Sequence, residues 1–316
     1  MTEATFAQST ASQRDATTPR RLRLWDRMSF SFVHAMVGVM LACMTLRGLY
    51  AFGRAFGTLE WLINYKRRRR FSRAHSFILE KPPSRDERRR ACRAYFMRSR
   101  CDKLFFLVLD RIDKERALGI FSITNRELLD EAAARGNGVY IALSHHGAQH
   151  VVTMFMALSG YKVAAVRDAN ESGLRLFMRN RFVAKHEEYR AIRWFHADSY
   201  PREIMRALRD GYLLGSAMDV SRTRNESQKT ESVVVFGEAR EFLTGPLRLA
   251  LKCDTPVVQA FVLPDSGFRY RLEIVGTILD PKTVTNETEA ISQAARTYAA
   301  NVETYVRRYQ SLISRI

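Results

Sequence analysis

The chain has 316 residues, enough for one large α/β domain with an appendage, and a formal net charge of +18. This charge indicates an anionic partner, which is nucleic acid, an anionic membrane surface, or an acidic carrier or substrate. Only the charge supports nucleic acid, because the sequence has no zinc-finger spacing or RRM-type motif, so we expect no nucleic-acid partner. It also lacks the Walker A, GxGxxG and GxSxG motifs of nucleotide binding and serine hydrolysis.

Residues 1–27 are predicted to be a disordered, basic N-terminus, because the first 19 are rich in Ser, Thr and Ala. Residues 28–64 are predicted to be a membrane anchor or an interfacial helical segment. The stretch Met28–Leu46 carries no formal charge, and as a helix it measures roughly 28 Å, close to the thickness of a bilayer core. Basic residues lie on both sides of the segment, which favours contacts with anionic lipid at its ends. The alternative is a long buried helix.

Residues 65–316 are predicted to be the main domain, with an Arg-rich helical part followed by alternating strands and helices from about residue 120. The predicted strands are Val139–Leu143, Lys162–Val166, Ala191–Phe195, Tyr212–Met218, Val233–Phe236, Val257–Leu263 and Tyr270–Val275. Predicted helices cover Val151–Leu158, begin at Pro201 and at Gly245, and run from Ile291 to Ile316 as one long amphipathic helix. This alternation predicts an α/β fold with a mostly parallel central sheet flanked by helices.

Polar residues follow four of the predicted strands. His145 follows the first, Arg167 and Asp168 the second, His196 the third, and Asp219 the fourth. If these strands are parallel, their carboxyl ends meet at one edge of the sheet, where active sites of such folds form. His145 is the candidate general base, since imidazole is suited to removing a hydroxyl proton near neutral pH. The alternative is a structural histidine that caps the next helix.

The other candidates each have a simpler interpretation. His146 and His150 lie four residues apart, which on a helix can bind a metal, but no third ligand is evident and we predict no metal site. Arg167 and Arg181 are suited to binding phosphate or carboxylate, although in so basic a chain a single arginine is more often solvated. Asp219 is suited to orienting a histidine or pairing an arginine, or else it caps a turn.

Over roughly residues 30 to 310, the chain resembles the bacterial lipid A biosynthesis (lauroyl/myristoyl) acyltransferases of the lysophospholipid acyltransferase-like superfamily. Their His-x4-Asp/Glu motif, with glycine two residues after the histidine, matches His145 and Gly147. The family's arginine after the second strand matches Arg167, and a second one falls near Arg181. Three further segments match, which are Met218-Asp219-Val220, Val235-Phe236-Gly237 and Thr244-Gly245-Pro246.

The resemblance implies a membrane-associated acyltransferase on the cytoplasmic face of the bacterial inner membrane. It would move a fatty acyl group from an acyl-carrier-protein or CoA thioester to a hydroxyl or amine of a lipid acceptor, without a cofactor. His145 would be the catalytic base, and the residues that bind substrate would be Gly147, Arg167, Arg181, Phe236 and Gly237.

The chain differs from the family motif at the acidic residue. His150 occupies that position, so the pattern is His-x4-His. We expect His150 to orient His145 and Asp219 to supply the missing negative charge. Two other classes of protein remain open. One is a catalytically silent lipid-binding relative, and the other is a metal-dependent hydrolase that uses His146 and His150.

Overall fold

The computed structural model describes residues 24–167, 173–196, 201–219 and 229–313. Most of the predicted disordered N-terminus lies outside these ranges, and residues 24–27 are the first turn of helix α2 (Leu24–Cys43). Asp168 and Val220, which the sequence analysis singled out, also lie outside the described residues.

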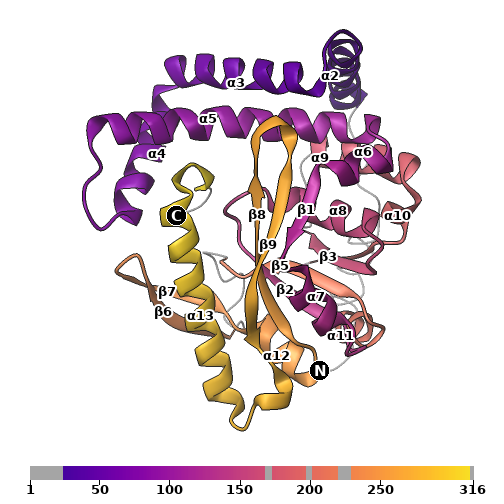
Figure 1. Ribbon diagram of the computed structural model, residues 1–316, viewed down its shortest axis with the longest axis vertical. Coiled ribbons are helices and arrows are strands. Elements are labelled where there is room, and N and C mark those ends of the chain that lie inside the picture. Colours follow the sequence, from indigo (N-terminus) through magenta and orange to yellow (C-terminus); the bar gives the residue numbers. More distant parts are fainter. Residues whose placement is uncertain (1–23, 168–172, 197–200, 220–228, 314–316) are drawn as a thin grey trace, which may run out of the picture.

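A seven-stranded sheet forms the centre of the molecule, in the order β1-β9-β8-β2-β5-β3-β4 (Figure 1). Its strands are β1 (Phe121–Thr124), β2 (Val139–Leu143), β3 (Val163–Arg167), β4 (Arg193–His196), β5 (Leu213–Ala217), β8 (Val257–Pro264) and β9 (Tyr270–Leu279). The five strands from β8 to β4 are mutually parallel, β9 is antiparallel to β8, and β1 is parallel to β9. The prediction of a mostly parallel sheet is confirmed.

Each predicted strand is present, but two strands were not predicted. Strand β1 has only four residues with alternating exposure, a signal too short to separate from a loop. Strand β7 (Glu238–Leu243) has three charged and three exposed residues among its six, and it pairs with β6 (Thr230–Val235) in a hairpin outside the main sheet. At its turn Phe236 and Gly237 both have positive φ, 54° and 79°, as a two-residue hairpin turn requires. Strand β7 therefore depends on this turn and not on an apolar pattern.

Helices cover both faces of the sheet, and the buried residues of β2 alternate between two cores. Val139, Ile141 and Leu143 pack into one core, and Tyr140 and Ala142 into the other. The helices after α2 are α3 (Leu46–Ile63), α4 (Tyr65–Ile78), α5 (Arg85–Val108), α6 (Lys114–Gly119), α7 (Arg126–Ala133), α8 (Val152–Leu158), α9 (Gly173–Lys185), α10 (Glu187–Arg190), α11 (Pro201–Arg209), α12 (Gly245–Lys252) and α13 (Glu287–Arg308).

The last helix is shorter than predicted. Helix α13 ends at Arg308, and a turn of 3-10 helix, η5 (Gln310–Leu312), follows it. The main-chain carbonyls of Ser311 and Leu312 accept hydrogen bonds from Arg98 and Gly147, which lie far away in the sequence. These contacts replace a further turn of helix, so the apolar periodicity to Ile316 overestimated its length.

Helix α5 lies across the carboxyl ends of the parallel strands, and α3 packs on the outer side of α5 (Figure 1). The ring of Phe105 in α5 lies 5.5 Å from that of Phe268, in the turn η3 (Ser266–Phe268) that follows β8. Within the described ranges, no helix is both long and apolar enough to cross a bilayer.

Two glycines of α3 allow its close approach to α5. A Cβ at Gly57 would lie 2.6 Å from the Cα of Met97 and 2.7 Å from the carbonyl oxygen of Phe96. A Cβ at Gly53 would lie 2.9 Å from Leu104 Cδ1. Because the contact at Gly57 is with backbone, no rotamer change of a neighbour relieves it.

We therefore expect Gly57→Ala to lower the free energy of unfolding by roughly 1–3 kcal/mol, the usual cost of overpacking. Gly48→Ala in the same helix is the matched control, since its nearest neighbour is at an ordinary 3.4 Å. It should raise stability by about 0.5–1 kcal/mol through helix propensity. Denaturant unfolding of both variants measures this, and equal effects would contradict the packing assigned to α3 and α5.

Candidate active site

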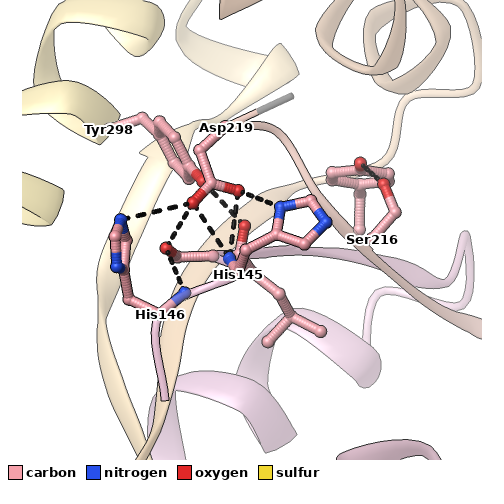
Figure 2. A network of polar contacts seen from close by, with 8 residues as sticks. His145, His146, Ser216, Asp219 and Tyr298 are labelled. Carbon is pink, nitrogen blue, oxygen red and sulfur yellow. Dashed lines mark hydrogen bonds and ion pairs between the residues drawn. The ribbon is translucent and has the colours of Figure 1, made fainter. Parts of the chain in front are cut away.

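The candidate site lies where two neighbouring parallel strands end. Strand β2 is buried at all five positions and leads directly into the loop Ser144–Ala148. Leu143 at its end pairs with Ala217 at the end of β5, and Asp219 follows two residues later. The loop and Asp219 therefore meet at the carboxyl edge of the sheet (Figure 2).

The Asp219 carboxylate is the centre of this network (Figure 2). Its Oδ1 lies 2.8 Å from Nδ1 of His145, and Oδ2 accepts a 2.6 Å hydrogen bond from the Ser144 hydroxyl. The main-chain N–H of His145 donates to both carboxylate oxygens, at 3.0 and 2.9 Å. The Nε2 atom of His146 lies 3.9 Å from Oδ2. Because a carboxylate only accepts hydrogen bonds, His145 carries its proton on Nδ1, and Nε2 is the basic nitrogen.

The environment of Asp219 keeps it charged. Burial alone would raise its pKa, but the hydrogen bond from His145, the electrostatic attraction of the two imidazole rings and the hydrogen bond from Ser144 together lower the pKa below its usual value. The opposite holds for His146, whose pKa is lowered chiefly by burial, against the attraction of Asp219. The site therefore combines an ionised carboxylate with a buried, neutral His146 beside the partly exposed ring of His145.

The backbone conformation of the loop Ser144–Ala148 requires a glycine at position 147. Its φ is +91°, and a Cβ there would lie 2.3 Å from the carbonyl oxygen of Val262 in β8. The same Val262 oxygen accepts a hydrogen bond from Ala148 N at 2.9 Å, while Gly147 N donates to the Leu312 carbonyl at 3.2 Å. Only glycine combines this dihedral angle with this close approach to the backbone.

The other predicted residues lie at different places. His150 is in the 3-10 turn η2 (Gln149–Val151), and its ring packs edge-on against Phe106 at 6.1 Å. Arg181 in α9 donates from Nε to Asp110 at 2.6 Å. Arg167 is the last residue of β3 and His196 the last of β4, so both backbones end at the same edge as His145, while their side chains are outside the described part of the chain.

Phe236 and Gly237 form the turn of the β6–β7 hairpin. The Phe236 ring packs against Phe77 at 6.1 Å, and its main-chain N–H donates to Glu303 in α13 at 3.3 Å. The contacts found for this pair are thus to α4 and α13, and the proposed contact with substrate stays a prediction.

Three residues that support the site were not predicted from the sequence. Ser144 bonds to Asp219, the Tyr298 hydroxyl donates to the Leu143 carbonyl at 2.7 Å, and Arg98 lies 3.5 Å from the Gly147 carbonyl. The sequence could have indicated Ser144, because this residue directly follows a predicted strand and precedes His145. Tyr298 fitted the apolar stripe of α13, and Arg98 is one of 51 basic residues.

The interpretation of His146 and His150 as a metal-binding pair assumed that they share a helix. The loop up to Ala148 is irregular, and the turn η2 begins only at Gln149, so they do not lie on one helical face. Among the residues that the structure describes, no group of three or more His, Cys, Asp or Glu side chains is arranged to hold a metal ion.

The model of a family described as bacterial lipid A biosynthesis acyltransferase matches residues 19–310, nearly the whole chain. No curated protein matches the chain.

The geometry of Gly147 predicts a large penalty for a side chain. Gly147→Ala should lower the free energy of unfolding by at least about 2 kcal/mol more than Gly237→Ala does, because it adds a clash with the backbone to an unfavourable φ. Gly237 is the matched control, since its φ is also positive but a Cβ there meets nothing within 4 Å. Denaturant midpoints of the two variants test this, and equal losses would exclude a special constraint at Gly147.

The lowered pKa of His146 predicts a pH dependence of stability. Between its native pKa and about 6.5, the unfolded chain binds a proton that the native protein does not, so stability falls as pH falls through this range. In His146→Gln, the decrease in melting temperature between pH 7.5 and 5.5 should be smaller than in the wild type. An unchanged decrease would mean that His146 is protonated in the native protein.

Proposed function

Because the chain belongs to the bacterial lipid A biosynthesis acyltransferase family, we propose that it transfers a fatty acyl group from a carrier-protein or CoA thioester to a hydroxyl or amine of a lipid acceptor. Family membership supports a membrane-associated lipid acyltransferase in general. The observation that carries the finer proposal is the His145–Asp219 pair at the carboxyl edge of the parallel sheet.

In the proposed reaction, Nε2 of His145 removes the proton from the acceptor hydroxyl or amine as its oxygen or nitrogen attacks the thioester carbonyl. The tetrahedral intermediate then collapses, the carbon–sulfur bond breaks, and the imidazolium returns the proton to the leaving thiolate. No acyl group is bound covalently to the protein at any step. The protein contributes a base of fixed orientation and a carboxylate that stabilises the imidazolium.

Asp219 supplies the charge that His150 lacks. At an effective dielectric constant near 20, unit charges about 4 Å apart attract by roughly 4 kcal/mol, before the cost of removing the carboxylate from water is subtracted. Asp219 is already ionised in the resting protein, so the reaction adds no further cost for removing its carboxylate from water. This arrangement favours an active enzyme over the alternative of a catalytically silent lipid-binding relative.

A surface formed by helices α2 and α3 supports binding to a lipid membrane. The exposed apolar side chains are Leu24, Trp25, Met28, Phe32, Val33, Met36 and Val39 on α2, and Phe52, Phe56, Leu59, Leu62 and Ile63 on α3. On α3 they lie opposite a second apolar stripe, which includes Leu49 and Trp61 and packs inward. A helix that is apolar on both faces needs a second apolar environment, and an exposed patch of this size marks an interaction surface.

Charge favours an anionic lipid surface as the partner of this face. Exposed basic residues border the apolar side chains, and they are Arg27, Arg47, Arg54, Lys66, Arg69 and Arg70. Helix α5 lies between α3 and the loop of His145, because α3 packs on α5 and Arg98 of α5 lies 3.5 Å from the Gly147 carbonyl oxygen. In the proposed arrangement, a lipid acceptor bound to this face would pass alongside α5 to reach His145. The cytoplasmic face of the inner membrane is the location that we propose.

Arg167 is the residue that we propose for binding phosphate or carrier groups. The strand end that it occupies is two strands from His145 in the sheet order, at the same edge. Arg181 is suited to this role only in part, since Asp110 already accepts one of its N–H groups. Neither role needs a cofactor.

Variants of the pair test the mechanism. Asp219→Asn should lower kcat roughly 1000-fold, because an amide can donate to the imidazole, favour the wrong tautomer and leave the imidazolium unstabilised. His145→Ala should be at least as slow, and His150→Leu should lose less than Asp219→Asn. Acyl transfer to the lipid fraction, measured with and without chelator, decides this. If His150→Leu were the slower variant, the charge would not come from Asp219, and sensitivity to chelator would favour the metal-dependent hydrolase.

Lipid binding is tested by serine substitutions on the proposed face. Phe52→Ser with Leu59→Ser should weaken partitioning into vesicles of anionic phospholipid at least tenfold, since two large apolar side chains no longer enter the membrane. Val234→Ser is the control, because Val234 is 68% exposed but lies on the β6–β7 hairpin. Co-sedimentation of full-length protein provides the partition coefficients. If the wild type, the double variant and Val234→Ser bound the vesicles equally, this face would not be the contact surface.

A further inference from the structure

Arg98 lies in the middle of α5, beside the loop that carries His145. Its Nη1 lies 3.2 Å from Asp102 Oδ2 and 3.5 Å from the carbonyl oxygen of Gly147, and its Nε donates to the carbonyl of Ser311 at 3.0 Å. Only 13% of the Arg98 side chain is exposed. Because its three acceptors lie in three different segments of the chain, this arginine holds those segments together.

These contacts surround Gly147. Its N–H is held by Leu312, its Cα lies against Val262, and its carbonyl faces Arg98. Ser311, the second main-chain acceptor of Arg98, directly precedes Leu312. The guanidinium therefore binds both the loop and the segment to which the loop is bonded.

Asp102 fixes the position of the guanidinium. It lies one turn further along α5, is buried, and forms an ion pair with Arg98. Burial raises the pKa of Asp102 to about 6, against the opposing effects of Arg98 and the Tyr270 hydroxyl, so the carboxylate is charged at neutral pH. The ion pair keeps Arg98 pointed at the two carbonyls.

We propose that Arg98 is a positioning residue for acyl transfer, which acts through the Gly147 carbonyl to keep the imidazole of His145 in line with Asp219. The inference rests on the proposed function, and Arg98 itself need touch no substrate. Gly147 is only two positions after His145, and the hydrogen bonds of His145 to Asp219 involve both its main chain and its ring. A shift of Gly147 therefore changes the ring's direction.

The structure offers a direct chemical test. Arg98 and Asp102 line a cavity of about 300 Å³, together with Tyr50, Arg54, Tyr270 and Ser311. In Arg98→Ala this cavity becomes larger and retains the Asp102 carboxyl group and the Ser311 carbonyl, and a bound cation would keep that carboxyl group ionised. A guanidinium ion can then occupy the position of the missing side chain.

With full-length protein in detergent, we expect Arg98→Ala to lower kcat at least tenfold while KM for donor and acceptor changes less than threefold. Guanidinium at non-denaturing concentration should restore kcat at least threefold, and methylammonium should restore less, because it lacks the planar set of donors. Arg98→Lys should be intermediate. A purely structural role would not produce rescue by guanidinium.

Arg100→Ala is the matched control. Arg100 is two residues further along the same helix, and it forms a 2.6 Å ion pair with Glu60, away from the loop. Its variant should keep kcat within twofold and should not respond to guanidinium. If both variants lost the same activity, or neither lost any, the inference would be wrong.

A second measurement separates this inference from the proposed function. In protein labelled with ¹⁵N-histidine, the Nδ1 proton that bonds to Asp219 should give a signal that Arg98→Ala loses and guanidinium restores. If the wild type transferred no acyl group to any lipid, the proposed function would fail, and this signal would still decide the role of Arg98. A signal unchanged in Arg98→Ala would overturn that role.

Discussion

A buried carboxylate must have hydrogen-bond donors, and this requirement organises the candidate site. Asp219 follows β5 by two residues and only 11% of its side chain is exposed, so an unpaired charge there would cost several kcal/mol. Its donors come from Ser144 and His145, which follow the neighbouring strand. The pairing of β2 with β5 is thus both a feature of the sheet and the means by which a histidine acquires an oriented ring.

The order of the layers places the exposed apolar side chains of α3 and the loop of His145 on opposite sides of α5. Parallel strands direct all their carboxyl ends toward α5, and α5 in turn carries α3 on its outer side. Gly53 and Gly57 allow α3 to approach α5 closely, so two tightly packed helices separate the exposed apolar side chains of α3 from the loop of His145.

The sequence predicted those parts of the fold and of the candidate site that depend on residues close together in the chain. Apolar runs revealed the strands β2 and β5, and therefore that His145 and Asp219 follow strand ends. They could not reveal that these two strands are neighbours, because strand order depends on long-range packing. From the sequence, His150 and Asp219 were both expected to act on the ring of His145, and the structure shows that Asp219 Oδ1 lies 2.8 Å from its Nδ1. Strand β7 and Arg98 had no local signal, since charged residues are frequent in this chain.

The contact between Gly147 and Leu312 has a consequence for the order of folding. The two residues are separated by more than half of the sequence, so the entropy of closing so long a loop must be overcome before this hydrogen bond forms. Local helices and the hairpin of β6 and β7 can form without it. The hydrogen bond that fixes Gly147 can therefore form only after the C-terminal segment has packed against the rest of the fold.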